Sequence, residues 1–395
     1  MVKKDYFKFF EDGETIKLSS EETIFKLSSF KENPIVKPKE LGLTWIENGE
    51  EKVGAVFNGG AEIYMNKVVL APRCHKNYVR EKFFDEKLGI ERYRMDNYIS
   101  EIWILQSEDF ISFQRLDNVV IKGDGSEHQD FTYGIEDIRI VRFYTGEYFL
   151  VGCGKTKPPF KGNNADRIAI YTTKDFKTIE YRGMVREIDT KNTVPFPELI
   201  DGKLFMFFRF HPNIHLDYLR AGVDQLLNPT KYSDYWKEVL RNKEKNLLFK
   251  AGTLRHEREK IGAGTQPIKT KEGWLIIYHA VGEISEELCS VYSVKGKIVR
   301  GYSVCAALLD LNDPTKIIAR TRNPIYIPSH PWELEGDSKY PIDIPYVVFP
   351  VGAIVQNDML LLYCGAGDKY EVLLTCKLNS LVDYLLKYCR VNKSQ

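Results

Sequence analysis

The chain has 395 residues, of which 43% are hydrophobic and 28% charged, and this ordinary globular composition excludes a wholly disordered or collagen-like chain. The 56 basic residues nearly cancel the 55 acidic ones and form no cluster, so we expect no nucleic-acid partner. No apolar run approaches the roughly 20 residues that cross a bilayer, and the first residues lack the apolar stretch of a signal peptide. We therefore expect no membrane partner.

The cysteines indicate the compartment. They are seven in number, scattered along the chain, and never spaced as Cys-X-X-Cys. This pattern argues against a disulfide framework or a zinc site and favours a reducing environment. We expect a cytoplasmic protein without a bound metal.

Aromatic residues make up 13% of the chain, which favours β-strands. Short strand-like runs recur along the chain, and each is closed by Gly, Asp or Asn. The strands expected in chain order are 53–57, 61–65, 67–72, 101–107, 138–144, 147–153, 167–173, 203–210, 273–281, 303–311, 347–355 and 359–367. This spacing predicts an all-β fold.

A degenerate repeat refines the expected architecture. SEDFISF at 107–113 resembles TKDFKTI at 173–179, and each combines a small polar residue, an Asp and an aromatic residue before a new strand. Repeated units of a few dozen residues built on such strands indicate the blades of a β-propeller. The spacing does not give the number of blades.

Four segments describe the predicted domain organisation. Residues 1–33 form an N-terminal extension and 34–376 the propeller, in which 215–250 reads as a partly helical insertion between blades. Residues 377–395 form a C-terminal helix and tail. Its helical face with Leu381, Tyr384, Leu385 and Tyr388 is expected to pack against the propeller. The extension and the insertion offer surfaces for a homo-oligomer.

The segment YGIEDIR (133–139) places two carboxylates and an arginine at the start of a strand. Asp137 and Arg139 are two residues apart, so we expect both side chains on the same face of the strand. Taken alone, such a pair is more often a surface ion pair than a catalytic group.

Other motifs are equally ambiguous when taken singly. Gly-Gly in FNGGA (57–61) permits a close backbone approach or a hairpin turn. The remaining candidates are Arg73 after the next strand, Lys191 and Asn192 in TKNTVPFPE, Lys260 before a Gly-X-Gly turn, His279 at the end of an apolar strand, and Asp368 after YCGAG. Each of these fits a loop, a solvated charge or a core histidine as well as it fits a site.

The order of all these motifs is more informative. Together with GKLFMFFR (202–209), and over about residues 33–370, they resemble glycoside hydrolase family 130, which comprises mannoside phosphorylases and related mannosidases. The resemblance implies a five-bladed β-propeller with its active site in the central cavity.

The resemblance also implies roles for individual residues. Asp137 matches the catalytic acid of the family. The residues expected at the substrate are Asn58, Arg73, Glu136, Tyr302, Phe349 and Asp368, and those expected to bind phosphate are Lys191, Asn192, Lys260 and His279. It implies no cofactor, with inorganic phosphate as a co-substrate. Lys191 stands where the phosphorylases usually have Arg, and a lysine lacks the bidentate geometry of guanidinium.

The balance of charges distinguishes two reactions. An inverting glycosidase needs an acid and a base that activates water, whereas a phosphorylase needs an acid and cations for its anionic nucleophile. The implied cations Lys191, Lys260 and His279 favour phosphorolysis of a β-mannoside or β-manno-oligosaccharide to α-mannose 1-phosphate. An inverting β-mannosidase and a non-catalytic sugar-binding propeller remain open alternatives, and the sequence does not give the linkage.

Overall fold

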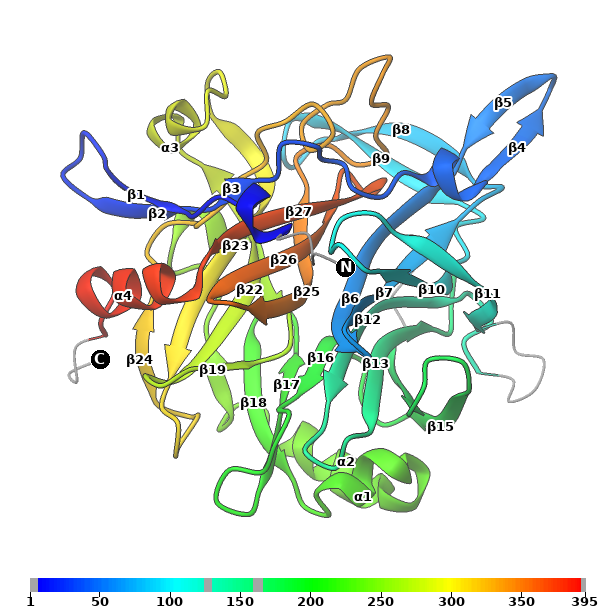
Figure 1. Cartoon of the computed structure of the whole chain (residues 1–395), viewed down its shortest axis with the longest axis vertical. Helices are drawn as coiled ribbons and strands as arrows, with labels where there is room; N and C mark the ends of the chain where they lie inside the picture. Colours follow the sequence, from blue (N-terminus) through cyan, green and yellow to red (C-terminus); the bar gives the residue numbers. More distant parts are fainter. Residues whose placement is uncertain (1–5, 124–129, 159–165, 392–395) are drawn as a thin grey trace.

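The computed structural model describes residues 6–123, 130–158 and 166–391, which form five four- or five-stranded antiparallel sheets around a central axis (Figure 1). This is a five-bladed β-propeller, so the expected all-β class and the implied number of blades are confirmed. The described residues contain no helix that is long and apolar enough to cross a bilayer.

The blades follow one another along the chain, and each begins with its innermost strand. Blade one contains β6 (Ala55–Tyr64), β7 (Lys67–His75), β10 (Glu101–Ser107) and β11 (Gln114–Lys122). Blade two contains β12 (Ile135–Arg142), β13 (Tyr148–Lys155), β14 (Asp166–Thr173) and β15 (Ile179–Val185). Blade three contains β16 (Lys191–Pro195), β17 (Leu204–Arg209), β18 (Ile214–Leu219) and β19 (Leu247–Phe249).

Blades four and five complete the circle. Blade four contains β20 (Lys260–Ala263), β21 (Ile268–Lys269), β22 (Trp274–Ile284), β23 (Ile298–Leu309) and β24 (Ile317–Arg320). Blade five contains β25 (Val348–Gln356), β26 (Met359–Ala366) and β27 (Tyr370–Lys377). Its fourth strand is β3 (Ser28–Ser29), which pairs antiparallel with β27.

Hydrophobic clusters fill the interfaces between neighbouring blades. In β7, Val68 and Leu70 belong to the cluster shared with blade five, whereas Val69 and Ala71 belong to the cluster shared with blade two. Successive residues of a strand point to opposite faces of its sheet, so a blade that is buried on both faces needs an unbroken apolar run. This requirement explains why runs such as KVVLAP form the sheets.

The N-terminal segment is partly integrated into the propeller. Within the predicted extension 1–33, η1 (Tyr6–Phe9) and the hairpin of β1 (Glu14–Lys17) and β2 (Thr23–Lys26) precede β3 of blade five. Strand β3 therefore joins the N-terminal part of the chain to the last strands of the propeller. Residues 1–5 lie outside the described residues.

The segment 215–250 lies within blade three and not between blades as expected. Its first residues complete β18 and its last form β19, so the helical part joins two strands of one sheet. That part consists of α1 (Val223–Leu227), η3 (Pro229–Tyr232) and α2 (Ser233–Arg241). Trp236 and Val239 of α2 pack into the cluster between blades two and three, which fixes the helix against the outside of the propeller.

The C-terminal helix is α4 (Leu378–Tyr388), and it packs against β24, β27 and β2. Leu381, Tyr384 and Leu385 are buried in this contact, whereas Tyr388 is 40% exposed. Three of the four residues on the expected apolar face therefore pack against the propeller. Residues 392–395 lie outside the described residues.

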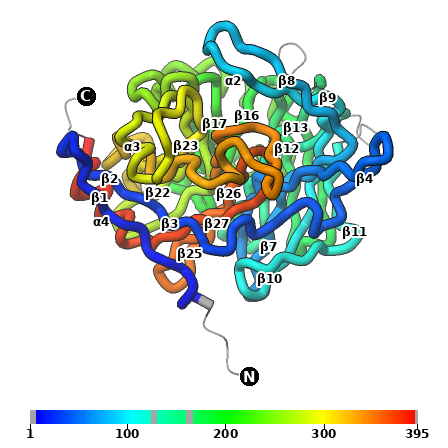
Figure 2. The backbone as a smooth tube through the Cα atoms, turned by 90° about the horizontal axis from the view of Figure 1, so that it is seen from above, coloured from blue at the N-terminus to red at the C-terminus, as the bar shows by residue number. Residues whose placement is uncertain are grey.

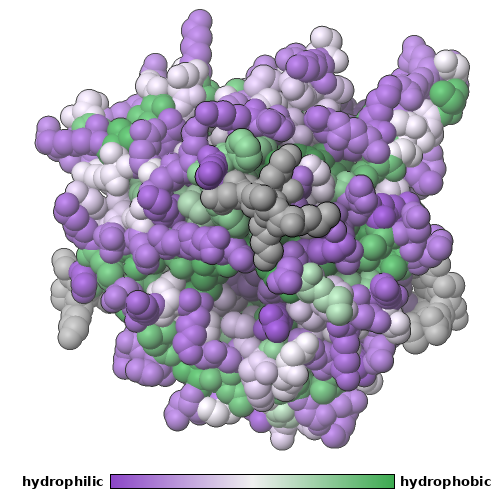
Figure 3. Space-filling model, in the orientation of Figure 1, coloured by the Kyte–Doolittle hydropathy of each residue, from purple (hydrophilic) through white to green (hydrophobic). Residues whose placement is uncertain are grey.

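The remaining elements lie outside the five sheets of the blades. They are η2 (Pro38–Leu41), β4 (Thr44–Glu47), β5 (Glu50–Val53), β8 (Val79–Asp85), β9 (Ile90–Asp96), η4 (Arg255–Glu257) and α3 (Glu286–Val291). Figure 2 shows the hairpin of β8 and β9 standing at the opposite side of the molecule from the N-terminus. The face viewed in Figure 3 is mainly hydrophilic, with apolar residues scattered between charged ones.

The sequence repeat corresponds to equivalent turns. Asp109 accepts hydrogen bonds from the backbone N–H groups of Ile111 and Ser112 between β10 and β11. Asp175 accepts equivalent bonds from two N–H groups between β14 and β15. Both turns join the last two strands of a blade, so the repeat marks consecutive blades.

Candidate active site

A cavity of about 1020 Å³ opens along the axis of the propeller. Its inner part, which we call the inner cavity, is lined by Asn58, Arg73, Tyr98, Glu136, Asp137, Lys155, Lys191, Asn192, Arg209, Lys260, Tyr302, Phe349 and Asp368. Its rim includes Arg80, Lys82 and Arg92 of the β8–β9 hairpin, together with Lys297, Arg300, Glu335 and Tyr346. Ten of the predicted site residues therefore meet in one cavity, and His279 is the exception.

Three of these side chains are positioned by bulges in the innermost strands. Asn58 in β6, Asp137 in β12 and Asn192 in β16 have positive φ angles of 58°, 52° and 54°. The pairing register of each strand shifts at the same point. A bulge inserts an extra residue and redirects a side chain, and Asn and Asp tolerate the left-handed conformation better than most residues. Each bulged residue lines the cavity.

Asp137, the predicted acid, is 4% exposed. The side-chain amide of Asn58 donates a hydrogen bond to its Oδ1 over 2.8 Å, and Arg73 lies 3.5 Å from the same oxygen. A Cβ at Gly365 would lie 1.9 Å from Oδ1 of Asn58, and one at Gly60 would lie 2.3 Å from the carbonyl oxygen of Ile138. These glycines allow three blades to approach closely at the acid. Of the two readings of the Gly-Gly pair, the close backbone approach is therefore the one observed, since Gly60 lies within β6 and not in a hairpin turn.

Arg139 does not pair with the carboxylate of Asp137. The bulge separates them, because Glu136 pairs with Cys153 and Arg139 with Val151, which places Glu136 and Arg139 in the same phase of the pleat. The Arg139 guanidinium is buried and donates to the carbonyl oxygens of Gly264, Ala263 and Asp137. The expectation that Asp137 and Arg139 share a strand face is wrong, and neither belongs to a surface ion pair.

Glu136 lies between cations. Its Oε2 is 3.1 Å from Nη1 of Arg73 and 3.8 Å from Nζ of Lys191. Burial disfavours its ionised form, but Arg73, Lys155 and Lys191 outweigh burial and hold the pKa of Glu136 below its usual range. Glu136 is therefore a carboxylate at neutral pH.

Lys191 also faces a second carboxylate. Its Nζ lies 3.9 Å from Oδ2 of Asp166, while Oδ1 of Asp166 accepts a hydrogen bond from Nζ of Lys155. Burial lowers the pKa of Lys155, but Glu136, Cys153 and Asp166 raise it by more. Lys155 therefore remains a positively charged ammonium group at neutral pH. Sequence reasoning did not single out Lys155 or Asp166, since each reads as the end of an ordinary strand.

A further group of charges surrounds Tyr302. Nζ of Lys260 lies 5.2 Å and Cζ of Arg300 5.3 Å from the centroid of its ring. Glu259 holds both cations, since Arg300 binds it over 2.6 and 2.8 Å and Lys260 lies 3.6 Å away. Burial raises the pKa of Tyr302, but the opposite effect of Lys260 and Arg300 is larger and brings the pKa down to about 7.

Asp368 lies in the tight turn between β26 and β27, where Gly367 and Asp368 both have positive φ angles, of 58° and 49°. Burial raises the pKa of Asp368 to about 6, although Arg73 acts in the opposite direction. Its side chain reaches the inner cavity on the side of Arg73. Asp368 can therefore accept hydrogen bonds there from a neutral ligand.

His279 lies behind the wall of the cavity. Its side chain is 0% exposed, and its ring is 4.3 Å from that of Phe349. Lys260–Ala263 forms strand β20 and not a Gly-X-Gly turn, and Gly262 leaves room for the His279 ring, which a Cβ would approach to 2.4 Å. Burial and the charges of Arg209 and Arg139 lower the pKa of His279, so it contributes no positive charge.

The structure adds other residues that sequence reasoning missed. Arg209 ends β17, Tyr98 precedes β10, and Arg300 belongs to β23, and all three line the cavity. Among these three residues, only Arg209 belongs to a motif that carries the family resemblance, since it is the last residue of GKLFMFFR. The described lining residues include ten Lys or Arg side chains and six carboxylates, so the cavity is electropositive.

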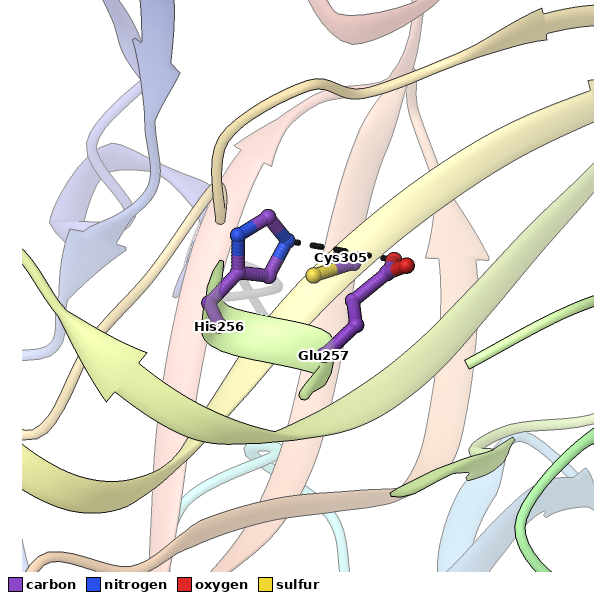
Figure 4. Close-up of side chains that lie close together, drawn as sticks. All are labelled: His256, Glu257 and Cys305. Atoms are coloured by element: carbon purple, nitrogen blue, oxygen red, sulfur yellow. Dashed lines mark ion pairs between the residues drawn. The ribbon is translucent and has the colours of Figure 1, made fainter. Parts of the chain in front are cut away.

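A separate cluster in blade four has the residue types of a metal site. His256, Glu257 and Cys305 place their ligand atoms within 4.8 Å of one another (Figure 4). Both oxygens of Glu257 accept bonds of 2.7 Å from Arg320, and one also accepts from Tyr278. A cation would compete with Arg320, so we interpret this cluster as a buried ion pair that joins η4 to β22 and β24.

The model of glycoside hydrolase family 130, described as beta-1,4-mannooligosaccharide phosphorylase, matches residues 26–387. The chain therefore belongs to this family.

Relatives cover most of the chain. It is 31% identical over 348 residues to a 1,2-beta-oligomannan phosphorylase of Thermoanaerobacter sp. strain X514, a match that covers 87% of this chain and 95% of the relative. It is 30% identical to a beta-1,2-mannobiose phosphorylase of Listeria innocua, with 86% and 92% covered. A Listeria innocua beta-1,2-mannobiose phosphorylase in complex with beta-1,2-mannobiose superposes with a TM-score of 0.63 and 25% identity, over 91% of this chain and 99% of that one.

Proposed function

We propose that this member of glycoside hydrolase family 130 is an inverting β-mannoside phosphorylase. It transfers a mannosyl unit from a β-mannoside or β-manno-oligosaccharide to inorganic phosphate, and releases α-mannose 1-phosphate reversibly. The names of relatives that match across most of their length support this assignment. The observation that carries it is the geometry: the buried side chain of Asp137 shares a cavity with the cations Lys191 and Lys260.

The reaction requires a proton donor on one face of the sugar and an anion on the other. The glycosidic C–O bond breaks, its oxygen receives a proton that originates on Asp137, and a phosphate oxygen forms the new bond to the anomeric carbon. Attack from the face opposite the leaving group inverts the configuration. Cations around the phosphate offset its repulsion by the electron-rich centre and fix its orientation.

The inner cavity divides into two parts on this proposal. Asn58, Arg73 and Asp368 surround one side of Asp137 and would bind the hydroxyl groups of the mannosyl unit, with Phe349 at its edge. On the other side, Lys191, Asn192 and Lys260 would bind phosphate, and Arg209 joins them on the cavity wall. His279 would act by filling the wall behind Lys260.

Hydrolysis on the same fold is the second candidate, because Glu136 is a carboxylate close to Lys191. A general base works best when its pKa lies near the working pH. Arg73, Lys155 and Lys191 hold the pKa of Glu136 far below that point, so it is a poor base for water. The cations that weaken Glu136 as a base are those that suit a phosphate anion, which favours phosphorolysis.

Phosphate dependence tests the proposed function directly. Turnover of β-linked mannobioses should require phosphate and yield mannose 1-phosphate, and sulfate should inhibit competitively with phosphate. Lys260→Ala should raise the KM for phosphate about tenfold or more and leave the KM for the mannoside nearly unchanged, because a charged hydrogen bond is lost to one ligand only. Lys316→Ala is the matched control, because Lys316 lies outside the cavity lining and also pairs with a carboxylate, Asp313, over 3.1 Å. Full-rate release of free mannose without phosphate would establish hydrolysis instead.

Tyr302 should make anion binding depend on pH. Below pH 7 its hydroxyl is neutral, and above pH 7 the phenolate cancels part of the charge of Lys260 and Arg300. The inhibition constant of sulfate, whose own charge is constant in this range, should therefore rise above pH 7 by at most about tenfold per pH unit. Tyr302→Phe should show a flat profile. A rise of equal slope in the Phe variant would assign the titration to another group.

The compartment and the assembly are further parts of the proposal. All seven cysteines lie among the described residues and are free, buried thiols, which supports a reducing cytoplasm. The proposed product, mannose 1-phosphate, is charged and does not cross a bilayer freely, which also favours an intracellular enzyme. We also propose that the protein forms a homo-oligomer, and the molecular mass measured by analytical ultracentrifugation would test this.

A further inference from the structure

Lys155 and Asp166 form a buried ion pair beside Lys191. The side chains of Lys155 and Asp166 are each 5% exposed, and Lys155 lines the inner cavity. The two residues are partners in neighbouring strands of blade two, because Lys155 ends β13 and Asp166 begins β14. An ion pair so deeply buried costs desolvation energy, which makes a purely stabilising role weak.

The carboxylate of Asp166 holds two ammonium groups. Its Oδ1 accepts the hydrogen bond from Lys155, and its Oδ2 lies 3.9 Å from Nζ of Lys191. The backbone fixes this arrangement, because the carbonyl oxygen of Asp166 accepts a hydrogen bond of 3.1 Å from the N–H of Thr190, next to Lys191. The N–H of Asp166 in turn donates to Asp189 over 3.2 Å. Two lysines from two blades are thus brought to one edge of the cavity.

We propose that Lys155 is a third phosphate-binding lysine beside Lys191 and Lys260, and that Asp166 positions Lys155 and Lys191 as a pair of donors equivalent to one guanidinium. This inference rests on the proposed phosphorylase function. One lysine is a point charge, whereas a guanidinium offers two parallel donors to two oxygens of a phosphate. Two ammonium groups held by the two oxygens of one carboxylate supply such a pair of donors.

The proposal accounts for the cost of burying the pair. In the absence of phosphate, Asp166 compensates the charge of Lys155, and the lysines in turn keep the pKa of Asp166 low against the effect of burial. An ammonium group has three donors, so Lys155 can retain its bond to Asp166 and still donate to phosphate. Glu136 and Asp166 stay separated from the anion by the lysines that they bind.

The test separates phosphate binding from mannoside binding. Lys155→Met should raise the KM for phosphate about 10- to 150-fold, as expected for one charge-assisted hydrogen bond, and change the KM for the mannoside less than twofold. A phosphate concentration that raises the melting temperature of the wild type should raise that of Lys155→Met much less, which is a readout independent of turnover. Lys316→Met should behave like the wild type, because Lys316 lies outside the cavity lining and is 72% exposed at its side chain.

A second variant tests the equivalence to guanidinium. Lys155→Met combined with Lys191→Arg should recover most of the lost phosphate affinity, since one guanidinium then replaces two ammonium groups. If Lys155→Met fails to fold, the neutral pair Lys155→Gln with Asp166→Asn removes both charges together and should show the same loss for phosphate alone.

Two outcomes would overturn the inference. One is an unchanged KM for phosphate and an unchanged phosphate-dependent melting shift in a folded Lys155 variant. The other is an equal loss for phosphate and mannoside, which would show that the ion pair merely supports the cavity. A wild type that turns over mannosides without phosphate would instead refute the proposed function itself, so the two failures are distinguishable.

Discussion

Asp137→Asn is expected to lower kcat by about 10²–10⁴ with the fold intact. The substitution keeps the size of the side chain and can keep a hydrogen bond to Asn58, but it removes the proton that the leaving oxygen must receive. General acid catalysis commonly contributes a factor of this size. The measurement is phosphorolysis of a β-mannobiose at saturating phosphate, together with the melting temperature of both proteins.

Asp217→Asn is the matched control for this variant. Asp217 is also a buried aspartate, 4% exposed, but it lies in β18 and pairs with Arg220 over 2.8 Å outside the cavity. We expect it to reduce stability and to leave kcat unchanged. Wild-type turnover in Asp137→Asn would remove Asp137 from the chemistry, and a loss in both variants of equal size would indicate a general structural effect.

The sequence predicts the propeller well because its blades are buried on both faces. Apolar runs such as 67–72 and 147–153 belong to strands that pack on two neighbouring blades, and they stand out without any alignment. The segment 215–250 was misplaced because short apolar runs do not distinguish a strand from a helix. Residues 215–219 pair with β17, and only the part that follows them is helical.

Three of the site residues that the sequence could identify lie at bulges of the innermost strands. Asn58, Asp137 and Asn192 occupy the same position in three consecutive blades, each with a positive φ angle. Asn or Asp within the sequence of an innermost strand is therefore a physical signal for a bulge that faces the axis. This signal could have been used without reference to any family.

The residues that were missed come from other strands. Lys155 and Arg209 end the second strands of their blades, and nothing in the local sequence shows that these ends reach the axis. The charge state of His279 was equally hidden, since it depends on Arg209 and Arg139, which are distant in the sequence. Long-range electrostatics of this kind requires the fold.

Arg73 carries the second large effect, because it serves both substrate binding and stability. Its side chain is 8% exposed, Nη1 lies 3.1 Å from Glu136, and the guanidinium lies 4.2 Å from the centroid of Phe57. Arg73→Met should weaken binding of mannose 1-phosphate about 10- to 150-fold, since a charge-assisted hydrogen bond contributes about 1.5–3 kcal/mol. It should also lower the free energy of unfolding by about 3–5 kcal/mol, because Glu136 loses its closest cation while buried.

Arg73→Lys separates these two contributions. A lysine restores a positive charge beside Glu136, so most of the lost stability should return, whereas the second donor for the sugar and the stacking on Phe57 should not. Denaturant unfolding should give a stability that falls from the wild type through Arg73→Lys to Arg73→Met. Titration with mannose 1-phosphate should instead show that the wild type binds much more tightly than either variant. If Arg73→Met binds mannose 1-phosphate as tightly as the wild type, Arg73 holds only Glu136, and the sugar must lie elsewhere in the cavity.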